Sequence, residues 1–219
     1  MGSANAAGRQ DTNYTKSVEL LKLDGIAVPK HVGASLSRYA DLIRAWNRGA
    51  SLVSSGDLDE IDRVHFPDAL SLAKYVAGAW GGEGLLLDIG SGAGLPAIPL
   101  KMVLPRIPMM LVERSGRKVA FLRKAVAHLG LEGVTIVQAN FPEGFATCQP
   151  RVITARAVER PGRLVRQTLS LMPVGSTYLC QSAVRLAIPE GFHVERICDA
   201  WTRTGLRRGE LRVISRPPL

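Results

Sequence analysis

Residues 85–94 read LLLDIGSGAG, an apolar segment of strand length that runs directly into a turn with Gly90, Gly92 and Gly94. Glycine is needed where the backbone bends tightly, or where a ligand approaches the main chain with no Cβ in between. In an open α/β sheet such a turn lies at the carboxyl ends of the strands, in the crevice where ligands bind. The segment therefore predicts a strand, a ligand-binding turn and a helix that accommodates Pro96 and Pro99 in its entry or first turn.

The chain after residue 81 alternates short apolar segments with helical ones. The apolar segments span residues 85–89, 109–113, 134–138, 152–155, 177–180, 193–198 and 211–214. Between the second and the third of them, Val119, Leu122 and Val126 fall on one face of a helix. Because such alternation is typical of a parallel sheet covered by helices, we predict an α/β fold.

The chain before residue 81 follows a different pattern. Apolar residues recur at helical spacing in residues 17–24, 31–48 and 57–76, and Pro67 is expected to break the last of these helices or to open a new one. Residues 1–15 are small and polar, so we expect a disordered arm there. The predicted parts are thus the arm 1–15, a helical extension 16–80 and the α/β domain 81–219.

The composition indicates a soluble protein with an anionic partner. Hydrophobic residues make up 46% of the chain and charged residues 21%, as in ordinary globular domains, and no apolar run is long enough for a membrane helix. The formal net charge is +9, and residues 151–219 contain twelve arginines, no lysine and five acidic residues. Arginine grips phosphates and stacks on bases, which favours nucleic acid as the partner; arginine bias on a solvated surface is the alternative.

The spacing of the glycines bears on the cofactor. A dinucleotide fingerprint would need a third glycine at position 95, where the chain has Leu95, so a nicotinamide or flavin enzyme is disfavoured. Glu113 ends the second predicted strand, nineteen residues after Gly94, where an acid can accept hydrogen bonds from the hydroxyls of an adenosine ribose. The turn and the acid together favour an adenosine-bearing cofactor, with a merely tight connection as the alternative.

The chain resembles the RsmG/GidB family of 16S rRNA guanine-N7 methyltransferases from about residue 42 to residue 158. The resemblance is carried by Trp46-Asn47, by His65-Phe66-Pro67-Asp68, by DIGSGAGLPAIPL at residues 88–100, by GRKVAFL at residues 116–122 and by Ala155-Arg156-Ala157. It implies a seven-stranded, Rossmann-like class I methyltransferase sheet behind a small N-terminal helical extension. It also implies S-adenosylmethionine as the methyl donor.

The same resemblance implies a set of site residues. Carried over by position, the cofactor-binding residues are Asp88, Gly90, Ser91, Gly92, Gly94, Leu95, Glu113, Phe141, Pro142 and Arg156. Glu113 would hold the ribose, Phe141 and Pro142 would flank the adenine, and Arg156 would act as the catalytic residue by positioning the substrate. The implied partner is 16S rRNA or the small ribosomal subunit, and we expect a cytoplasmic monomer without a metal site.

The chain departs from the usual family pattern at several positions. Val64 and Ala69 stand where Arg and Ser are usual, Pro142 replaces an acid, Ala155 replaces a Ser, and Gln181-Ser182 replaces a Lys-Gly pair. These departures leave two alternatives open: a diverged methyltransferase of small molecules, and a non-catalytic RNA- or ribosome-binding protein. For His65 and Asp68 we expect a mutual contact that pins the helical extension to the domain, and a contact with the substrate is the alternative.

Overall fold

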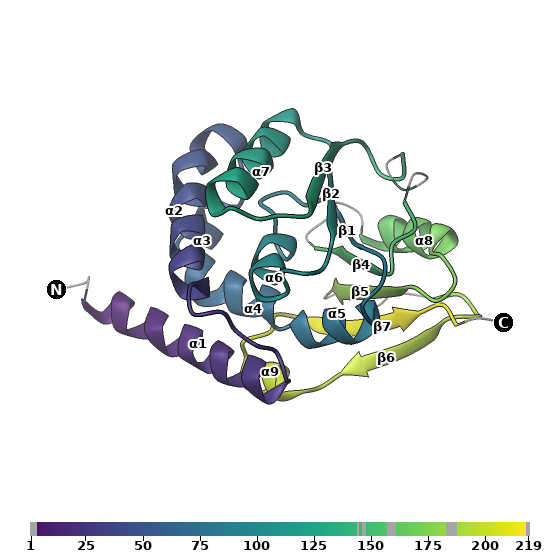
Figure 1. Ribbon diagram of the computed structural model, residues 1–219, viewed down its shortest axis with the longest axis horizontal. Coiled ribbons are helices and arrows are strands. Elements are labelled where there is room, and N and C mark those ends of the chain that lie inside the picture. Colours follow the sequence, from purple (N-terminus) through teal and green to yellow (C-terminus); the bar gives the residue numbers. More distant parts are fainter. Residues whose placement is uncertain (1–3, 144, 146–147, 157–160, 183–187, 218–219) are drawn as a thin grey trace.

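The computed structural model describes residues 4–143, 145, 148–156, 161–182 and 188–217, and within them seven strands form one sheet (Figure 1). The strands are β1 (Leu86–Ile89), β2 (Met109–Glu113), β3 (Val134–Gln138), β4 (Val152–Ala155), β5 (Thr177–Ser182), β6 (His193–Ile197) and β7 (Glu210–Ser215). The helices are α1 (Ala4–Leu23), α2 (Val32–Ala50), α3 (Ser55–Leu58), the π-helical turn η1 (Ile61–His65), α4 (Phe66–Leu70), α5 (Ala73–Trp80), α6 (Ala97–Val103), α7 (Gly116–Leu129), α8 (Pro161–Leu171) and α9 (Ala200–Arg203).

The strand order across the sheet is β3-β2-β1-β4-β5-β7-β6. All seven predicted strands are confirmed, with ends that differ by at most two residues. The expected all-parallel arrangement is wrong at one edge, because β7 runs antiparallel between β5 and β6. In the parallel part, Ile89 pairs with Val112 of β2 and with Ala155 of β4, so the carboxyl ends of these three strands lie side by side.

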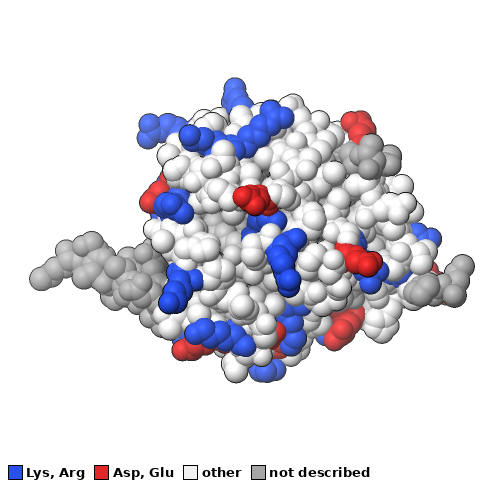
Figure 2. All heavy atoms as spheres, in the orientation of Figure 1, with Lys and Arg blue, Asp and Glu red and all other residues white. Residues whose placement is uncertain are grey.

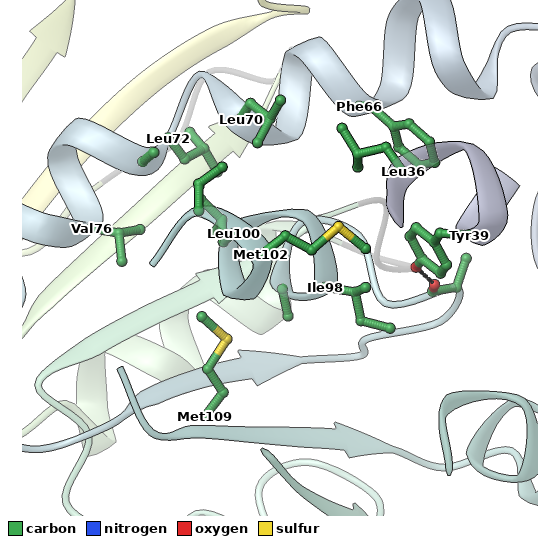
Figure 3. Packing of buried hydrophobic residues seen from close by; sticks show 14 of the residues in the cluster. Leu36, Tyr39, Phe66, Leu70, Leu72, Val76, Ile98, Leu100, Met102 and Met109 are labelled. Atoms are coloured by element: carbon green, nitrogen blue, oxygen red, sulfur yellow. Dashed lines mark hydrogen bonds between the residues drawn. The ribbon is translucent and has the colours of Figure 1, made fainter. Parts of the chain in front are cut away.

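Alternate strand residues separate two hydrophobic clusters on the two faces of the sheet. Leu86 and Leu111 belong to a large cluster with α1, α2 and α4–α7, while Leu87 and Ile153 belong to a smaller one with α8. Figure 1 shows α8 on one side of the strands and the N-terminal helices on the other. The predicted N-terminal extension therefore packs directly on the sheet and shares its larger core (Figure 3).

The N-terminal helices differ in extent from the helical pattern of the sequence. Helix α1 spans Ala4–Leu23, and within it the Asn13 side chain donates to the Arg63 carbonyl at 2.8 Å and the Tyr14 ring packs against Gly33. The helical pattern over residues 57–76 forms α3, η1, α4 and α5 rather than one helix, and Pro67 opens α4 as predicted.

Across the described part of the chain, none of the helices combines the length and the apolar character that a membrane crossing requires.

Candidate active site

The glycine turn leaves β1 at its carboxyl end and is held by its neighbours. The amides of Gly90 and Ser91 donate to the Val112 carbonyl at 2.9 and 3.1 Å, and the amide of Gly92 donates to Glu113 Oε2 at 2.9 Å. Gly92 has a φ of +57°, a region that favours glycine. The turn is thus fixed against the end of β2 by its own main chain.

A cavity of about 1010 Å³ opens at this end of the sheet. Eight of the ten predicted cofactor residues line it, namely Gly90, Ser91, Gly92, Leu95, Glu113, Phe141, Pro142 and Arg156. They come from the carboxyl ends of β1, β2 and β4 and from the segment after β3, and the parallel pairing places these at the same end of the sheet. The tertiary structure therefore brings together residues that lie as far as 66 positions apart in sequence.

Asp88 and Gly94 are the two predicted cofactor residues that do not line the cavity. The Asp88 carboxyl is 1% exposed beneath the turn and accepts from Thr154 Oγ1 at 2.7 Å. Burial raises the pKa of Asp88 to about 7. A Cβ at Gly94 would lie 2.5 Å from Ile98 Cδ1, so packing beneath the turn favours glycine at this position.

Glu113 presents an oriented carboxylate to the cavity. Its Oε2 accepts from the Gly92 amide, and its Oε1 accepts from the Ser115 amide at 2.8 Å. Each carboxylate oxygen has a second acceptor direction, so both remain able to bind a hydroxyl group. Two main-chain hydrogen bonds therefore hold the side chain in place at the end of β2.

The segment after β3 contributes an aromatic wall. Phe141 lines the cavity and meets Phe145 edge to face, with ring centroids 5.7 Å apart. Pro142 also lines the cavity but has no amide hydrogen to donate. Asn140, beside them, offers an amide group that can both donate and accept.

Arg156 follows β4 and is held from behind by α4. Its Nη2 lies 2.5 Å from Asp68 Oδ2, and Asp68 Oδ1 accepts from Gln181 Nε2 and from the Arg208 amide, each at 2.6 Å. The Nη1 atom of Arg156 is buried and has no hydrogen-bond partner among the residues that the structure describes. Arg156 therefore lines the cavity with a guanidinium that Asp68 fixes, and its Nη1 donor is buried and unused.

The expected contact between His65 and Asp68 is not formed. His65 Nε2 lies 3.0 Å from Asp57 Oδ1, while Asp68 binds Arg156. His65 ends η1, a π-helical turn in which the amide of Phe66 donates to the carbonyl of Ile61, whereas Asp68 lies in α4. The His65 side chain lines the cavity beside Asp57, whereas Asp68 is fully buried behind it.

A family model described as GidB, rRNA small subunit methyltransferase G, matches residues 33–185. The chain belongs to this family. The ribosomal RNA small subunit methyltransferase G of Roseiflexus castenholzii is 38% identical over 169 residues, 74% of this chain and 70% of the relative. The protein of the same name from a second Roseiflexus is 33% identical over 201 residues, 89% of this chain and 80% of the relative.

Solved structures agree with the predicted Rossmann-like methyltransferase sheet. A putative O-methyltransferase from Klebsiella pneumoniae has a TM-score of 0.60 at 12% identity, over 93% of this chain and 97% of that chain. A variant of MtNAS in complex with S-adenosylmethionine has a TM-score of 0.60 at 15% identity, over 92% and 83% of the two chains. At these identities the likeness concerns the fold, and the predicted fold class is confirmed.

In this member of the methyltransferase G family, most arginines of residues 151–219 bind carboxylates or main-chain carbonyls of the protein itself. Arg156, Arg196, Arg207, Arg208 and Arg212 form ion pairs with carboxylates, and Arg151, Arg203 and Arg216 donate to main-chain carbonyls. The arginine count of residues 151–219 is therefore a poor guide to RNA contact, because a count contains no information about partners. Basic side chains instead gather over α2 and α7 (Figure 2), and Arg114, Lys118 and Arg163 line the cavity.

Several cavity residues of this family member were missed from the sequence. Asn140 lies two residues beyond the end of β3, a position at which parallel sheets place functional side chains, so a usable signal existed. Residues 51–54 form a loop after α2, and Asp57 is in the short helix that follows it. No local pattern predicts that this loop lines the same cavity as the glycine turn, since the loop follows α2, which packs on α7.

Proposed function

We propose that this chain transfers a methyl group from S-adenosylmethionine to N7 of a guanine in 16S ribosomal RNA. The observation that carries the proposal is one cavity with a glycine turn and an oriented Glu113 together with Arg156, whose Nη1 donor is unused. Membership in the rRNA small subunit methyltransferase G family supports the same reaction and substrate class.

The residues present fit S-adenosylmethionine. At Gly92 a Cβ would meet only the Gly90 carbonyl, at 3.7 Å, so a longer side chain there would extend into space that the glycine leaves open. Glu113 offers acceptors for the two ribose hydroxyls, and Phe141 offers an apolar face for the adenine. When bound, S-adenosylmethionine supplies an electrophilic methyl group, whose carbon–sulfur bond breaks as the bond to guanine N7 forms.

The remaining chemistry is positioning. Guanine N7 carries an in-plane lone pair and no proton at neutral pH, so the chain needs no general base for this step. Arg156 would donate to guanine O6 and leave N7 free, while Asp68 keeps the guanidinium in place. The positive charge that develops on the methylated base would remain in a cavity that the Glu113 carboxylate also lines.

The proposal is tested with S-adenosylmethionine that carries a labelled methyl group. Small ribosomal subunits and their deproteinised RNA are incubated with the protein, and the RNA is digested to nucleosides. We expect label in 7-methylguanosine at one position. Transfer to no RNA, by a protein that binds S-adenosylmethionine in calorimetry, would reject the proposal.

A pair of glycine variants locates the cofactor. Gly92→Leu places a side chain in the cavity, so we expect S-adenosylmethionine affinity to fall at least about 100-fold, while the sheet still folds. Gly130→Leu is the matched control: its φ is +64°, and nothing lies within 4 Å of the added Cβ at the end of α7. Retained affinity in Gly92→Leu would mean that the cofactor binds elsewhere.

A second candidate function is methylation of a small molecule, which is favoured by the ion pairs that most C-terminal arginines form within the protein. The dependence of substrate binding on ionic strength distinguishes it from methylation of RNA. RNA binding should weaken steeply between about 50 and 200 mM salt, whereas binding of a neutral metabolite should hardly change. Binding of RNA without any binding of S-adenosylmethionine would favour a non-catalytic RNA-binding protein.

A further inference from the structure

The cavity has a second polar wall that the methyl-transfer step does not use. Asp57 of α3 and His65 of η1 line the same cavity as Arg156. A bridge through Arg208 connects the two sides, because its amide binds Asp68 behind Arg156 and its guanidinium lies 3.8 Å from Asp57. The cavity is thus lined by a guanidinium, that of Arg156, and by a carboxylate, that of Asp57, and Arg208 connects the two.

The Asp57 carboxylate is oriented and remains accessible. Ser54 Oγ donates to its Oδ2 at 2.6 Å, and His65 Nε2 lies 3.0 Å from its Oδ1. The hydrogen bond from Ser54, together with His65 and Arg208, lowers the pKa of Asp57, so that the group is ionised at neutral pH and only accepts. Its side chain is 39% exposed, which leaves acceptor directions open toward the cavity.

This pair of groups matches the hydrogen-bonding edge of guanine. Guanine presents an acceptor at O6, next to a donor at N1 and a donor amino group at C2, while N7 lies on the other side of O6. Adenine reverses this order, since its amino group donates where O6 accepts and its N1 accepts. A base that is turned out of its strand can be read along this edge by side chains in a pocket.

We propose that Asp57 is a specificity residue that accepts hydrogen bonds from N1–H and the C2 amino group of the target guanine, with Arg156 on O6. The inference rests on the proposed function, because it requires a guanine in the cavity. The neighbouring Glu60 is excluded from this role, since it binds Arg63 and Arg208 and does not line the cavity.

The experiment compares two substrates that differ by one amino group. The RNA that the labelling assay identifies is prepared with guanosine or with inosine at the methylated position, and kcat/KM is measured for both. With the wild-type protein, inosine should reduce kcat/KM about 10- to 100-fold, the effect of one hydrogen bond to a charged acceptor. Asp57→Asn should reduce kcat/KM for guanosine by a similar factor, and its inosine penalty should shrink to about twofold.

Glu60→Gln is the matched control, because Glu60 binds the same guanidinium of Arg208 but does not line the cavity, so this variant should keep the full inosine penalty. S-adenosylmethionine affinity, measured for each variant, reports that the fold is intact. An inosine penalty absent from the wild type, or undiminished in Asp57→Asn, overturns the inference while guanine methylation stands. No methylation of guanine by the wild type would overturn the proposed function and this inference together.

Discussion

At the residue scale, Asp88 belongs to the glycine-turn motif but is buried beneath the turn, where it bonds to Thr154. The strand β1 ends one residue later, and the pleat turns the Asp88 side chain to the interior face, away from the cavity. Thr154 of β4 donates to Oδ1, and Oδ2 has no partner within the described residues. The carboxyl is thus favoured in its protonated form, which costs less to bury than a charge.

A pH dependence of stability follows from this burial. The pKa of Asp88 is about 7 in the folded protein, against 3.8 for the free group, so between these values the native state holds a proton that the unfolded chain has lost. This group therefore makes the free energy of unfolding fall as pH rises, by at most about 1.4 kcal/mol per pH unit. Asparagine does not titrate.

We expect the stability of Asp88→Asn relative to the wild type to increase from pH 4.5 to about pH 7 and then to level off. Urea unfolding across this range measures the difference. Asp41→Asn, at an exposed carboxylate of α2, corrects for the general loss of one negative charge. A difference that does not change with pH would contradict the account of Asp88.

At the element scale, α2 lies in the N-terminal extension but contacts the glycine turn directly. Tyr39 is fully buried, and its hydroxyl donates to the Ala93 carbonyl of the glycine turn (Figure 3). Its ring stacks on Phe66 at 5.4 Å between centroids and lies near Phe121 of α7. The turn is therefore fixed from below by α2 as well as from the side by Glu113.

Tyr39→Phe keeps the ring and removes this hydrogen bond. We expect the KM for S-adenosylmethionine to rise about fivefold to 20-fold, while kcat at saturation changes little, because the turn becomes less ordered before the cofactor binds. Tyr75→Phe is the matched control, since it removes a partly buried hydroxyl contact to Asp199 at 2.8 Å that lies outside the cavity. An unchanged KM in Tyr39→Phe would show that α2 has no part in ordering the turn.

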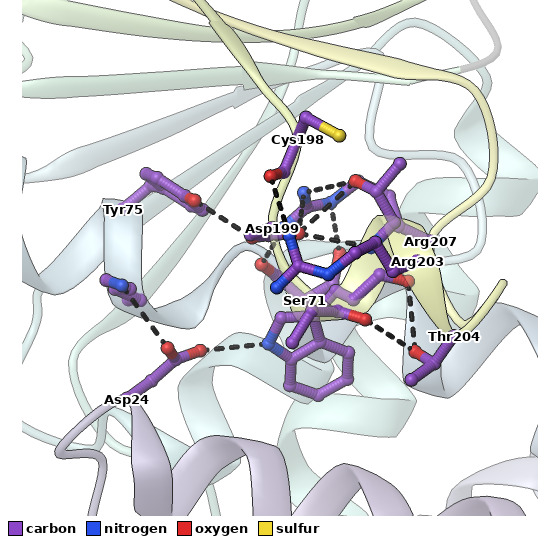
Figure 4. A network of polar contacts seen from close by, with 12 residues as sticks. Asp24, Ser71, Tyr75, Cys198, Asp199, Arg203, Thr204 and Arg207 are labelled. Atoms are coloured by element: carbon purple, nitrogen blue, oxygen red, sulfur yellow. Dashed lines mark hydrogen bonds and ion pairs between the residues drawn. The ribbon is translucent and has the colours of Figure 1, made fainter.

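At the scale of the whole molecule, a polar network joins the N-terminal helices to the C-terminal strands (Figure 4). Arg207 is fully buried and binds Asp199 at 2.7 and 2.9 Å as well as the Ser71 carbonyl at 2.8 Å. Trp201 of α9 donates to Asp24 beyond α1 at 2.9 Å. The network holds the segment before β7 against α4, from which Asp68 supports Arg156.

Arg207→Met should therefore lower the stability of the whole protein. Removal of the cation leaves the partly buried Asp199 without its main partner, so we expect the free energy of unfolding to fall by about 3 kcal/mol in urea denaturation. Arg203→Met, which loses a contact to the Cys198 carbonyl at 3.3 Å on the exposed side of the same network, should cost less than about 0.5 kcal/mol. Equal effects of the two variants would mean that the Arg207 pair adds nothing to stability.

Local pattern was sufficient for the strands, for α7 and for most of the glycine-turn site. Strand periodicity and turn chemistry depend on near neighbours, so residues 85–94 and Glu113 could be assigned before any contact was known. Residue type also made Arg156 a candidate, through Arg156-Ala157, which matches the family motif although Ala155 replaces its Ser.

Only the tertiary structure decided how these residues are supported and which others join them. Three pairs connect elements that packing brings together: Asp68 with Arg156, His65 with Asp57, and Tyr39 with Ala93. No rule of sequence spacing predicts such partners. The same holds for the arginines of the last third, most of which neutralise internal carboxylates. Charge can be counted along a chain, but its effect depends on distance and burial, which exist only after folding.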